Sequence, residues 1–359
     1  MTESVKLNKE LSKNFNDKVN KAIKIQERIR NSSNKVHRAV NWNREVDGFT
    51  FAFWEKNLEQ MWVDTEFVPS KDRNVWDRLE PEVQDAYKKV LAGLTLLDTK
   101  QGNVGMPAIA EHVDILQRKA VLSFMAMMEN IHAKSYSTIF TTLLTDVEID
   151  EVFDWVEENQ FLQFKAEQIS HYYENITDNK TLYLAMVASV FLESFLFYSG
   201  FFLPLWLSGQ GKMVASGEII NKIIQDESIH GVYVGLLAQE LYNELTVAEQ
   251  EEVDYETNAL LEELMENEFA YTEDIYSVLG LDHEVKNFLY YNANKALMNL
   301  GKPAKYEEKK INPIVQNGLN TESGTHDFFS TKGKSYKKAK HRALTDQDFS
   351  FPRLAEPLI

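Results

Sequence analysis

The chain has 359 residues, of which 44% are apolar, and its 21 Phe, 15 Tyr and 6 Trp can build a large aromatic core. It has no cysteine, which excludes disulfides, zinc ribbons and thiolate catalysis and leaves His and carboxylate side chains to hold any metal. Its net charge of −17 argues against nonspecific nucleic-acid binding, so we expect no nucleic-acid partner.

The first 36 residues are polar and basic, with nine Lys/Arg against four Asp/Glu. They are predicted to form an N-terminal helical arm, residues 1–36. The first six residues have no apolar h-region, so a secretory signal is not expected and the cytoplasm is the default location. An aromatic-rich segment that includes Trp42 follows, from Val40 to about Ser70.

Long periodic stretches with few Gly and Pro predict an all-α domain over residues 37–301. Pro81 suits the first position of a helix, and Thr246 with the acids after it suits a helix N-cap. The predicted helices span 81–106, 112–144, 149–174, 179–208, 213–243, 247–275 and about 282–299. Beyond Gly301 the periodicity fades, and residues 302–359 are predicted to be a flexible C-terminal tail.

One predicted helix mimics a membrane span. The residues from Leu182 to Leu207 carry a single charged side chain, Glu193, near the middle. A carboxylate in the centre of a bilayer is unfavourable, whereas a helix surrounded by protein is also apolar on all sides. We therefore favour a buried helix over a transmembrane one and expect no membrane contact.

Two short motifs, Glu129-Asn-Ile-His132 and Glu227-Ser-Ile-His230, have the same Glu-x-x-His spacing. Residues three apart on an α-helix lie on one face, so each motif offers a carboxylate and an imidazole to the same metal ion. A single motif of this kind is common. Two of them, each in an apolar helical context, indicate a di-metal site.

Two further carboxylates lie inside apolar runs, Asp98 after Leu97 and Glu193 in Val190-Phe-Leu-Glu-Ser-Phe. A buried carboxylate is costly unless it is paired or binds a metal. Taken singly, each has an ordinary explanation, such as pairing with a lysine. Together they complete four carboxylates and two imidazoles on four helices, as in the di-metal site of a ferritin-like bundle.

Tyr136 lies one turn beyond His132 on the same predicted helix face. A lone core tyrosine is usually only a packing residue. Close to two metal ions and among apolar residues such as Phe197, Phe201 and Ile223, it is a candidate for oxidation by the metals.

With these motifs the chain resembles the small, radical-generating subunit of class I ribonucleotide reductase, and class Ib in particular. The resemblance covers roughly Val40 to Phe351. The matching text comprises Asn41-Trp-Asn, Leu97-Asp-Thr-Lys-Gln-Gly, Met128-Glu-Asn-Ile-His-Ala-Lys-Ser-Tyr, Phe191-Leu-Glu-Ser-Phe, Asp226-Glu-Ser-Ile-His, Asn312-Pro-Ile and His326-Asp-Phe-Phe.

The resemblance implies a role for each matching residue. Asp98, Glu129 and His132 would hold the metal ion nearer the tyrosine, and Glu193, Glu227 and His230 the other, with Glu129 and Glu227 bridging. Tyr136 would carry the radical. Trp42 resembles the family's tryptophan near the site, Asp226 the aspartate that links it to His132, and Tyr336 the mobile tyrosine that relays the radical to the large subunit.

The same resemblance implies reduction of ribonucleotides to deoxyribonucleotides together with a large subunit, which the C-terminal tail would bind. It implies a dinuclear centre of manganese or iron, a homodimer and, for manganese, a flavodoxin-like activating protein. Two alternatives share the bundle, a di-metal oxidase or hydroxylase acting on an organic substrate and a ferritin-like metal store. Asp98, Tyr136, Trp42 and the tail argue against the first alternative, and the second would need neither a radical tyrosine nor a docking tail.

Overall fold

In the computed structural model the residues that are described are 13, 17–24 and 37–319. Within these ranges all regular secondary structure is helical, as predicted. Residues 17–24 of the predicted arm are helical, and the rest of that arm lies almost wholly outside the described residues. Residues 320–359 also lie outside them, and with them Tyr336.

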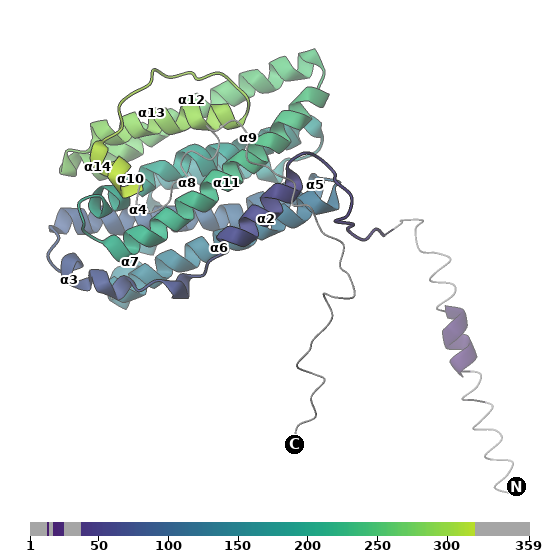
Figure 1. Ribbon diagram of the computed structural model, residues 1–359, viewed down its shortest axis with the longest axis horizontal. Helices are drawn as coiled ribbons and strands as arrows, with labels where there is room; N and C mark the ends of the chain where they lie inside the picture. The colour runs from purple at the N-terminus through teal and green to yellow at the C-terminus, as the bar shows by residue number, and fades with distance from the viewer. Residues whose placement is uncertain (1–12, 14–16, 25–36, 320–359) are drawn as a thin grey trace, which may run out of the picture.

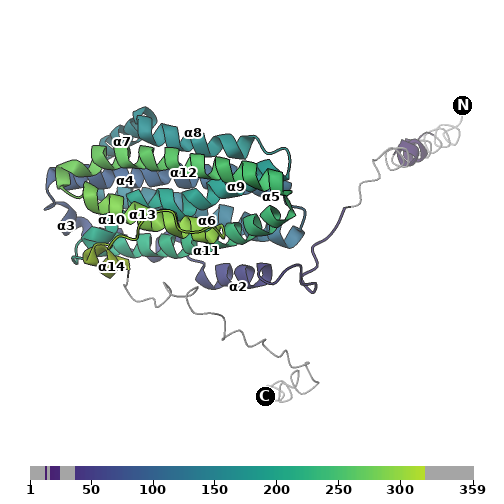
Figure 2. The same cartoon turned by 90° about the horizontal axis from the view of Figure 1, so that it is seen from above.

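The bundle is built from long helices that lie side by side with roughly parallel axes (Figures 1 and 2). The inner ones are α4 (Pro81–Lys100), α6 (Leu116–Leu143), α9 (Asn179–Phe191), α10 (Phe197–Ser208) and α11 (Val214–Glu244). The others are α2 (Thr50–Gln60), α3 (Arg73–Trp76), α5 (Met106–His112), α7 (Asp146–Glu158), α8 (Gln160–Glu174), α12 (Val247–Tyr276), α13 (Asp282–Asn299) and α14 (Pro313–Leu319). Short 3₁₀ segments are η1 (Asp64–Glu66), η2 (Pro69–Asp72) and η5 (Ser277–Leu279).

Helix starts follow the expected chemistry. Pro81 is the first residue of α4. Thr246 caps α12 in a reciprocal arrangement, because its hydroxyl accepts from Glu249 N while the Glu249 carboxylate accepts from the Thr246 backbone N–H. The helix predicted over 149–174 is instead two helices, because the Asn159 side chain caps a new helix by accepting from the backbone N–H groups of Phe161 and Leu162.

Two π-helical segments interrupt the inner helices, η3 (Gln101–Gly105) between α4 and α5, and η4 (Leu192–Leu196) between α9 and α10. Such single-turn insertions recur at functional sites, where they change the direction of a side chain. The helix predicted to end at 106 continues through η3 to His112, and α6 begins only at Leu116 after a short extended link.

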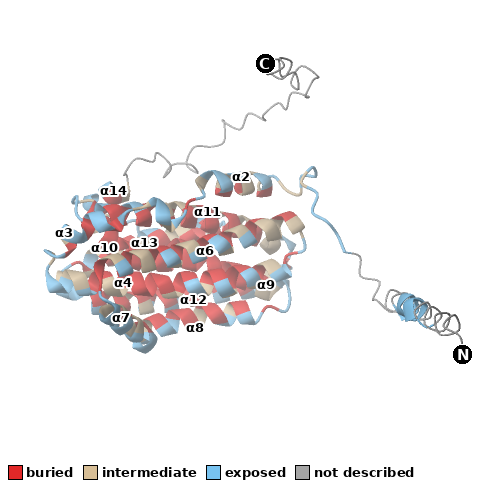
Figure 3. Ribbon diagram, turned by 90° about the horizontal axis from the view of Figure 1, so that it is seen from below, coloured by how far each residue is buried: buried red, intermediate tan, exposed pale blue. Residues whose placement is uncertain are grey.

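The most apolar 18-residue window of the stretch from Asn179 to Ser208 has a mean hydropathy of 1.7, yet this window is wholly buried inside the protein. The prediction of a buried helix is therefore confirmed. Figure 3 shows buried residues concentrated along the helices in the middle of the bundle, with exposed residues on the outer faces.

The predicted tail boundary at residue 302 is wrong, because residues 302–319 pack on the bundle. Lys302 and Lys305 form ion pairs with Asp254 and Glu262 of α12. In α14 the side chain of Val315 is fully buried. Ion pairs and a helix of seven residues produce little hydrophobic periodicity, which is why this stretch resembled a tail in the sequence.

Candidate metal centre

The six predicted ligands come from four elements of the inner bundle and meet in its interior. Asp98 projects from the end of α4, Glu193 from η4, and the two Glu-x-x-His motifs from α6 and α11. All six side chains are fully buried, with no exposed area. The i, i+3 spacing places each Glu and His of a motif on one face of its helix, as the sequence predicts.

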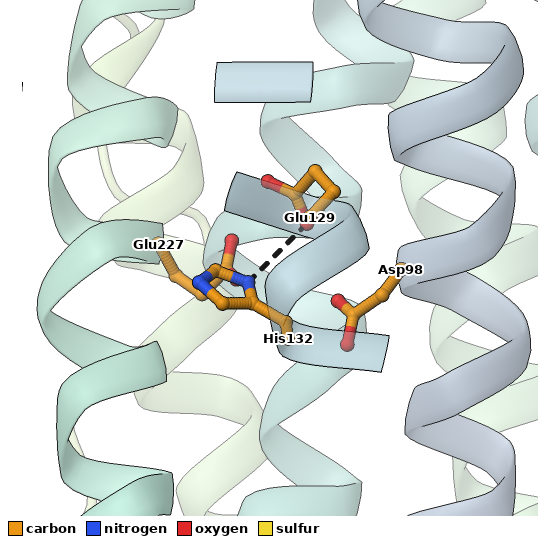
Figure 4. Close-up of side chains that lie close together, drawn as sticks. All are labelled: Asp98, Glu129, His132 and Glu227. Carbon is orange, nitrogen blue, oxygen red and sulfur yellow. Dashed lines mark ion pairs between the residues drawn. The ribbon is translucent and has the colours of Figure 1, made fainter. Parts of the chain in front are cut away.

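The six side chains form two overlapping groups, each with ligand atoms within 4.8 Å of one another. One group is Asp98, Glu129, His132 and Glu227, whose side chains converge in Figure 4. The other is Glu129, Glu193, Glu227 and His230. Glu129 and Glu227 belong to both, which is the arrangement that two ions with two shared carboxylates require.

Both imidazoles turn the same nitrogen toward the carboxylates. The Nδ1 atom of His132 lies 2.9 Å from Oε1 of Glu227 and 3.5 Å from Oε2 of Glu129. The Nδ1 atom of His230 lies 2.6 Å from Oε1 of Glu129 and 3.5 Å from Oε2 of Glu193. Nδ1 is therefore the ligand atom that each histidine offers.

The donor atoms fit metal ions because, apart from the close contacts that they make with one another, they have almost no partners among the described residues. Seven of the eight carboxylate oxygens of Asp98, Glu129, Glu193 and Glu227 have no hydrogen-bond partner among the described residues, and neither have the two Nδ1 atoms. Buried polar atoms are normally satisfied, so such a concentration of exceptions needs another partner. Two divalent cations would balance four carboxylates, and an oxygen-rich set with two imidazoles suits iron or manganese.

The pKa values show how the side chains share protons without ions. Burial, and then the charge of Glu129, raises the pKa of Asp98 and of Glu227 well above the usual carboxyl range. Burial alone would lower the pKa of His132, but its contacts with Asp226 and Glu129 outweigh this and raise the pKa to about 10. Protons thus occupy groups that a metal ion needs deprotonated.

Asp226 precedes Glu227 in the sequence and contacts His132 on the side of the ring that faces away from the carboxylates. Its Oδ2 atom lies 3.0 Å from Nε2 of His132, the histidine nitrogen that points away from the carboxylates. The same oxygen accepts a 2.7 Å hydrogen bond from the indole N–H of Trp62. A carboxylate on the outer nitrogen fixes the tautomer and direction of a ligating imidazole.

The tryptophan at this position is Trp62, so the prediction of Trp42 is wrong. Trp62 is 2% exposed, and its ring stacks on His132 with centroids 5.8 Å apart and planes 16° from parallel. Trp42 is only half-buried and packs its ring against Phe51 and Trp54. Several tryptophans lie in this aromatic segment, and nothing in its linear pattern indicates which one the chain brings back to α6.

Tyr136 lies on α6 one turn beyond His132 and is fully buried. Its hydroxyl has no hydrogen-bond partner among the described residues. Burial, and then the charge of Asp98, raises the pKa of Tyr136 well above its usual value, so the side chain is a neutral phenol. The predicted neighbours Phe197, Phe201 and Ile223 are also fully buried.

An all-α bundle with two Glu-x-x-His helices and two further carboxylate helices around one buried centre defines the ferritin-like di-metal carboxylate class. Comparison with known proteins narrows this class. A family model described as ribonucleotide reductase, small chain, matches residues 39–313. The chain is 57% identical over 320 residues to the ribonucleoside-diphosphate reductase subunit beta of Bacillus subtilis (strain 168), covering 88% of this chain and 97% of the relative.

Two further relatives agree. The chain is 41% identical over 320 residues to the nrdF1 beta subunit of Mycobacterium tuberculosis (strain ATCC 25618 / H37Rv), covering 88% of this chain and 98% of the relative. It matches the crystal structure of dimanganese(II)-NrdF from Streptococcus sanguinis with a TM-score of 0.77 and 46% identity, covering 79% of this chain and all of that one. The chain therefore belongs to the ribonucleotide reductase small-chain family, the radical-generating beta subunits of ribonucleoside-diphosphate reductase.

As a member of this family the chain works with a large subunit, and the predicted family, fold class and activity are confirmed. The oxidase and metal-store alternatives are set aside. The residues of the site that sequence reasoning missed are Trp62 and Gln101, which donates a hydrogen bond to Glu193.

Proposed function

We propose that this chain stores an oxidising equivalent as a tyrosyl radical on Tyr136 and delivers it to the large subunit for reduction of ribonucleotides. The observation that carries the proposal is the fully buried Tyr136, one turn from His132, beside a centre of unpaired carboxylates. The chain has no cysteine, so the thiols that reduce a ribonucleotide must come from the partner.

We further propose that one ion is held by Asp98, Glu129 and His132 and the other by Glu193, Glu227 and His230, with Glu129 and Glu227 shared. Manganese and iron both suit these ligands, and one of the similar solved structures is a dimanganese(II) protein. When bound and oxidised by oxygen or a reduced oxygen species, the two ions would supply the one-electron oxidation of Tyr136.

The protein residues handle the proton of that oxidation. A neutral tyrosyl radical forms when Tyr136 loses one electron together with its hydroxyl proton. The raised pKa of Tyr136 means that a buried phenolate is unfavourable, so the proton has to leave with the electron. Among the nearby carboxylates, Asp98 does most to raise the pKa of this hydroxyl, and we propose that it accepts the proton.

The oxidising equivalent is proposed to leave the site through the residues that contact the outer nitrogen of His132. Asp226 joins His132 to Trp62 through one carboxylate oxygen, giving a continuous link away from the centre. Trp62 takes the role that the sequence assigned to Trp42. Tyr336 stays a proposed final relay residue, and the C-terminal tail the proposed segment that binds the large subunit.

The proposed assembly is a cytoplasmic homodimer that associates with the large subunit. A flavodoxin-like protein is proposed as the activator when manganese is bound. Both proposals rest on the similarity to class Ib beta subunits.

Electron paramagnetic resonance tests the central proposal. Wild type and Tyr136→Phe are loaded with Fe(II) plus oxygen, and separately with Mn(II) plus a reduced flavodoxin-like activator and oxygen. We expect a tyrosyl signal in wild type that is absent from Tyr136→Phe, and activity with a large subunit only where the signal forms. Metal binding without a radical under either loading would overturn the assignment of Tyr136.

A further inference from the structure

Glu193 differs from the other three carboxylates of the centre in that the protein holds one of its oxygens. Its Oε1 atom accepts a short hydrogen bond from the side-chain amide of Gln101. Its Oε2 atom has no hydrogen-bond partner among the described residues and faces Nδ1 of His230 at 3.5 Å. The two oxygens therefore have different surroundings before any ion binds.

The amide that makes this contact is itself fixed in direction. Gln101 is fully buried, and its amide nitrogen also donates to the Ser189 hydroxyl at 2.8 Å. Its amide oxygen accepts a 2.6 Å hydrogen bond from the hydroxyl of Tyr173, which is 3% exposed. A carboxylate can only accept, so the nitrogen end of the amide must face Glu193, and the Tyr173 O–H satisfies the other end.

Backbone geometry brings these groups together. Gln101 begins the π-helical segment η3, and Glu193 lies in the π-helical segment η4. Gly105 makes room for the contact, because a Cβ atom there would lie 2.4 Å from the amide oxygen of Gln101 and 2.6 Å from the Tyr173 ring. The two π-helical segments η3 and η4 are thus joined by the hydrogen bond between Gln101 and Glu193.

We propose that Gln101 is a positioning residue that holds Oε1 of Glu193, so that only Oε2 is presented to the ion at His230, and that Tyr173 holds the amide in the required direction. This inference rests on the proposed assignment of Glu193 and His230 to one ion. The amide prevents the carboxylate from turning to bind through both oxygens or to move away. A ligand held in place binds its ion more tightly, because less freedom is lost on binding.

The test is a titration of the metal-free full chain with Mn(II), in which free Mn(II) is counted from its six-line electron paramagnetic resonance signal. Wild type is expected to bind two ions per chain. Gln101→Leu is expected to keep one ion and to bind the other about 10–100-fold more weakly. The spectrum of its bound Mn(II) should lack the signal of two exchange-coupled manganese ions at Mn(II) concentrations where wild type shows that signal.

Two further variants make the result specific. Tyr173→Phe leaves the amide of Gln101 in place but unoriented, and is expected to weaken the same ion by a smaller factor. Gln117→Leu is the matched control, because Gln117 is a buried glutamine (7% exposed) whose amide donates to the Asn41 carbonyl instead of a ligand. It should bind both ions as wild type does.

The outcomes are distinguishable. Wild-type affinity for both ions in Gln101→Leu and Tyr173→Phe would overturn the inference and leave the proposed centre intact. An equal loss of both ions in Gln101→Leu, with wild-type melting by circular dichroism, would overturn the assignment to Glu193 alone. Should Gln101→Leu fail to fold, Tyr173→Phe decides, since it leaves every group that touches Glu193 in place. A wild-type chain that binds fewer than two ions would overturn the proposed centre itself.

Discussion

At the scale of single residues, the two halves of the centre are unequal although their motifs are identical. The outer nitrogen of His132 contacts Asp226, whereas the outer nitrogen of His230 has no hydrogen-bond partner among the described residues. Conversely, the amide of Gln101 holds Glu193, and no described residue makes such a contact with Asp98. One half is therefore oriented through its histidine and the other through its carboxylate.

This difference predicts the effect of Asp226→Asn. The change keeps the shape of the side chain but removes the charge that faces His132 and Trp62 through one oxygen. We expect the ion at His132 to bind about 10–100-fold more weakly while the ion at His230 is retained, the reverse of the pattern for Gln101→Leu. The Mn(II) titration measures both affinities, and loss of the ion at His230 would contradict the expectation.

The pKa shifts of the ligands predict that protons compete with metal ions. Asp98 and Glu227 have raised pKa values, and the pKa of His132 is about 10, so each holds a proton at a pH where it would otherwise have lost it. Metal binding must release these protons, so affinity should rise as the pH rises and fall as it falls. Calorimetric titration at pH 7 in buffers of different ionisation enthalpy measures the release, and a heat independent of the buffer would contradict it.

At the scale of elements, the end of a helix can be fixed by a side chain that is distant in the sequence. Asp72 of η2 lies at the start of α11, the helix that carries Glu227 and His230. Its carboxylate accepts from the backbone N–H of Ala215 at 3.1 Å and from the backbone N–H and hydroxyl of Ser216, each at 2.7 Å. Asp72 is 4% exposed, so water has little access to these bonds.

We therefore expect Asp72→Ala to lower the free energy of unfolding by about 1–3 kcal/mol, because it removes a helix cap and leaves buried donors unsatisfied. Urea unfolding measures the change, with an unaltered slope if the denatured state is the same. Asp77→Ala is the control, since Asp77 is half-exposed and its one ion pair within the described part of the chain is with Arg73 one turn away. It should change stability by less than about 1 kcal/mol, and an equal effect of the two variants would argue against the cap.

The elements also show what a single sequence can predict. Proline at position 81 and the Thr246 box mark helix starts through chemistry local to the turn, and both are confirmed. The break at Asn159 was missed because an asparagine inside a periodic stretch gives no signal until its side chain turns back to cap. The π-helical segments were missed because one extra residue in a turn leaves the apolar pattern almost unchanged.

At the scale of the whole molecule, the six candidate ligands could be picked out in the sequence because charge inside apolar runs is rare and needs a partner. Trp62 and Gln101 were not, because tryptophan and glutamine are unremarkable beside apolar helices, and their roles arise only from contacts between distant segments. The anchoring of residues 302–319 was hidden for the same reason. It depends on lysines that meet acids of α12 in space.

The centre joins α4, α6, η4 and α11, so it should contribute to the stability of the entire bundle. An ion that binds the folded chain alone stabilises it by about 2.7 kcal/mol when present at 100 times its dissociation constant. We expect Mn(II) to raise the melting temperature of the metal-free protein by about 5 °C or more, since 1 kcal/mol corresponds to about 2–4 °C in domains approaching this size. Glu129→Ala, which removes a carboxylate shared by both groups, should lose this rise. Differential scanning calorimetry with and without Mn(II) measures it. Tight Mn(II) binding with no rise in wild type would mean that the unfolded chain binds the ion equally well, which a centre preformed by four helical elements does not allow.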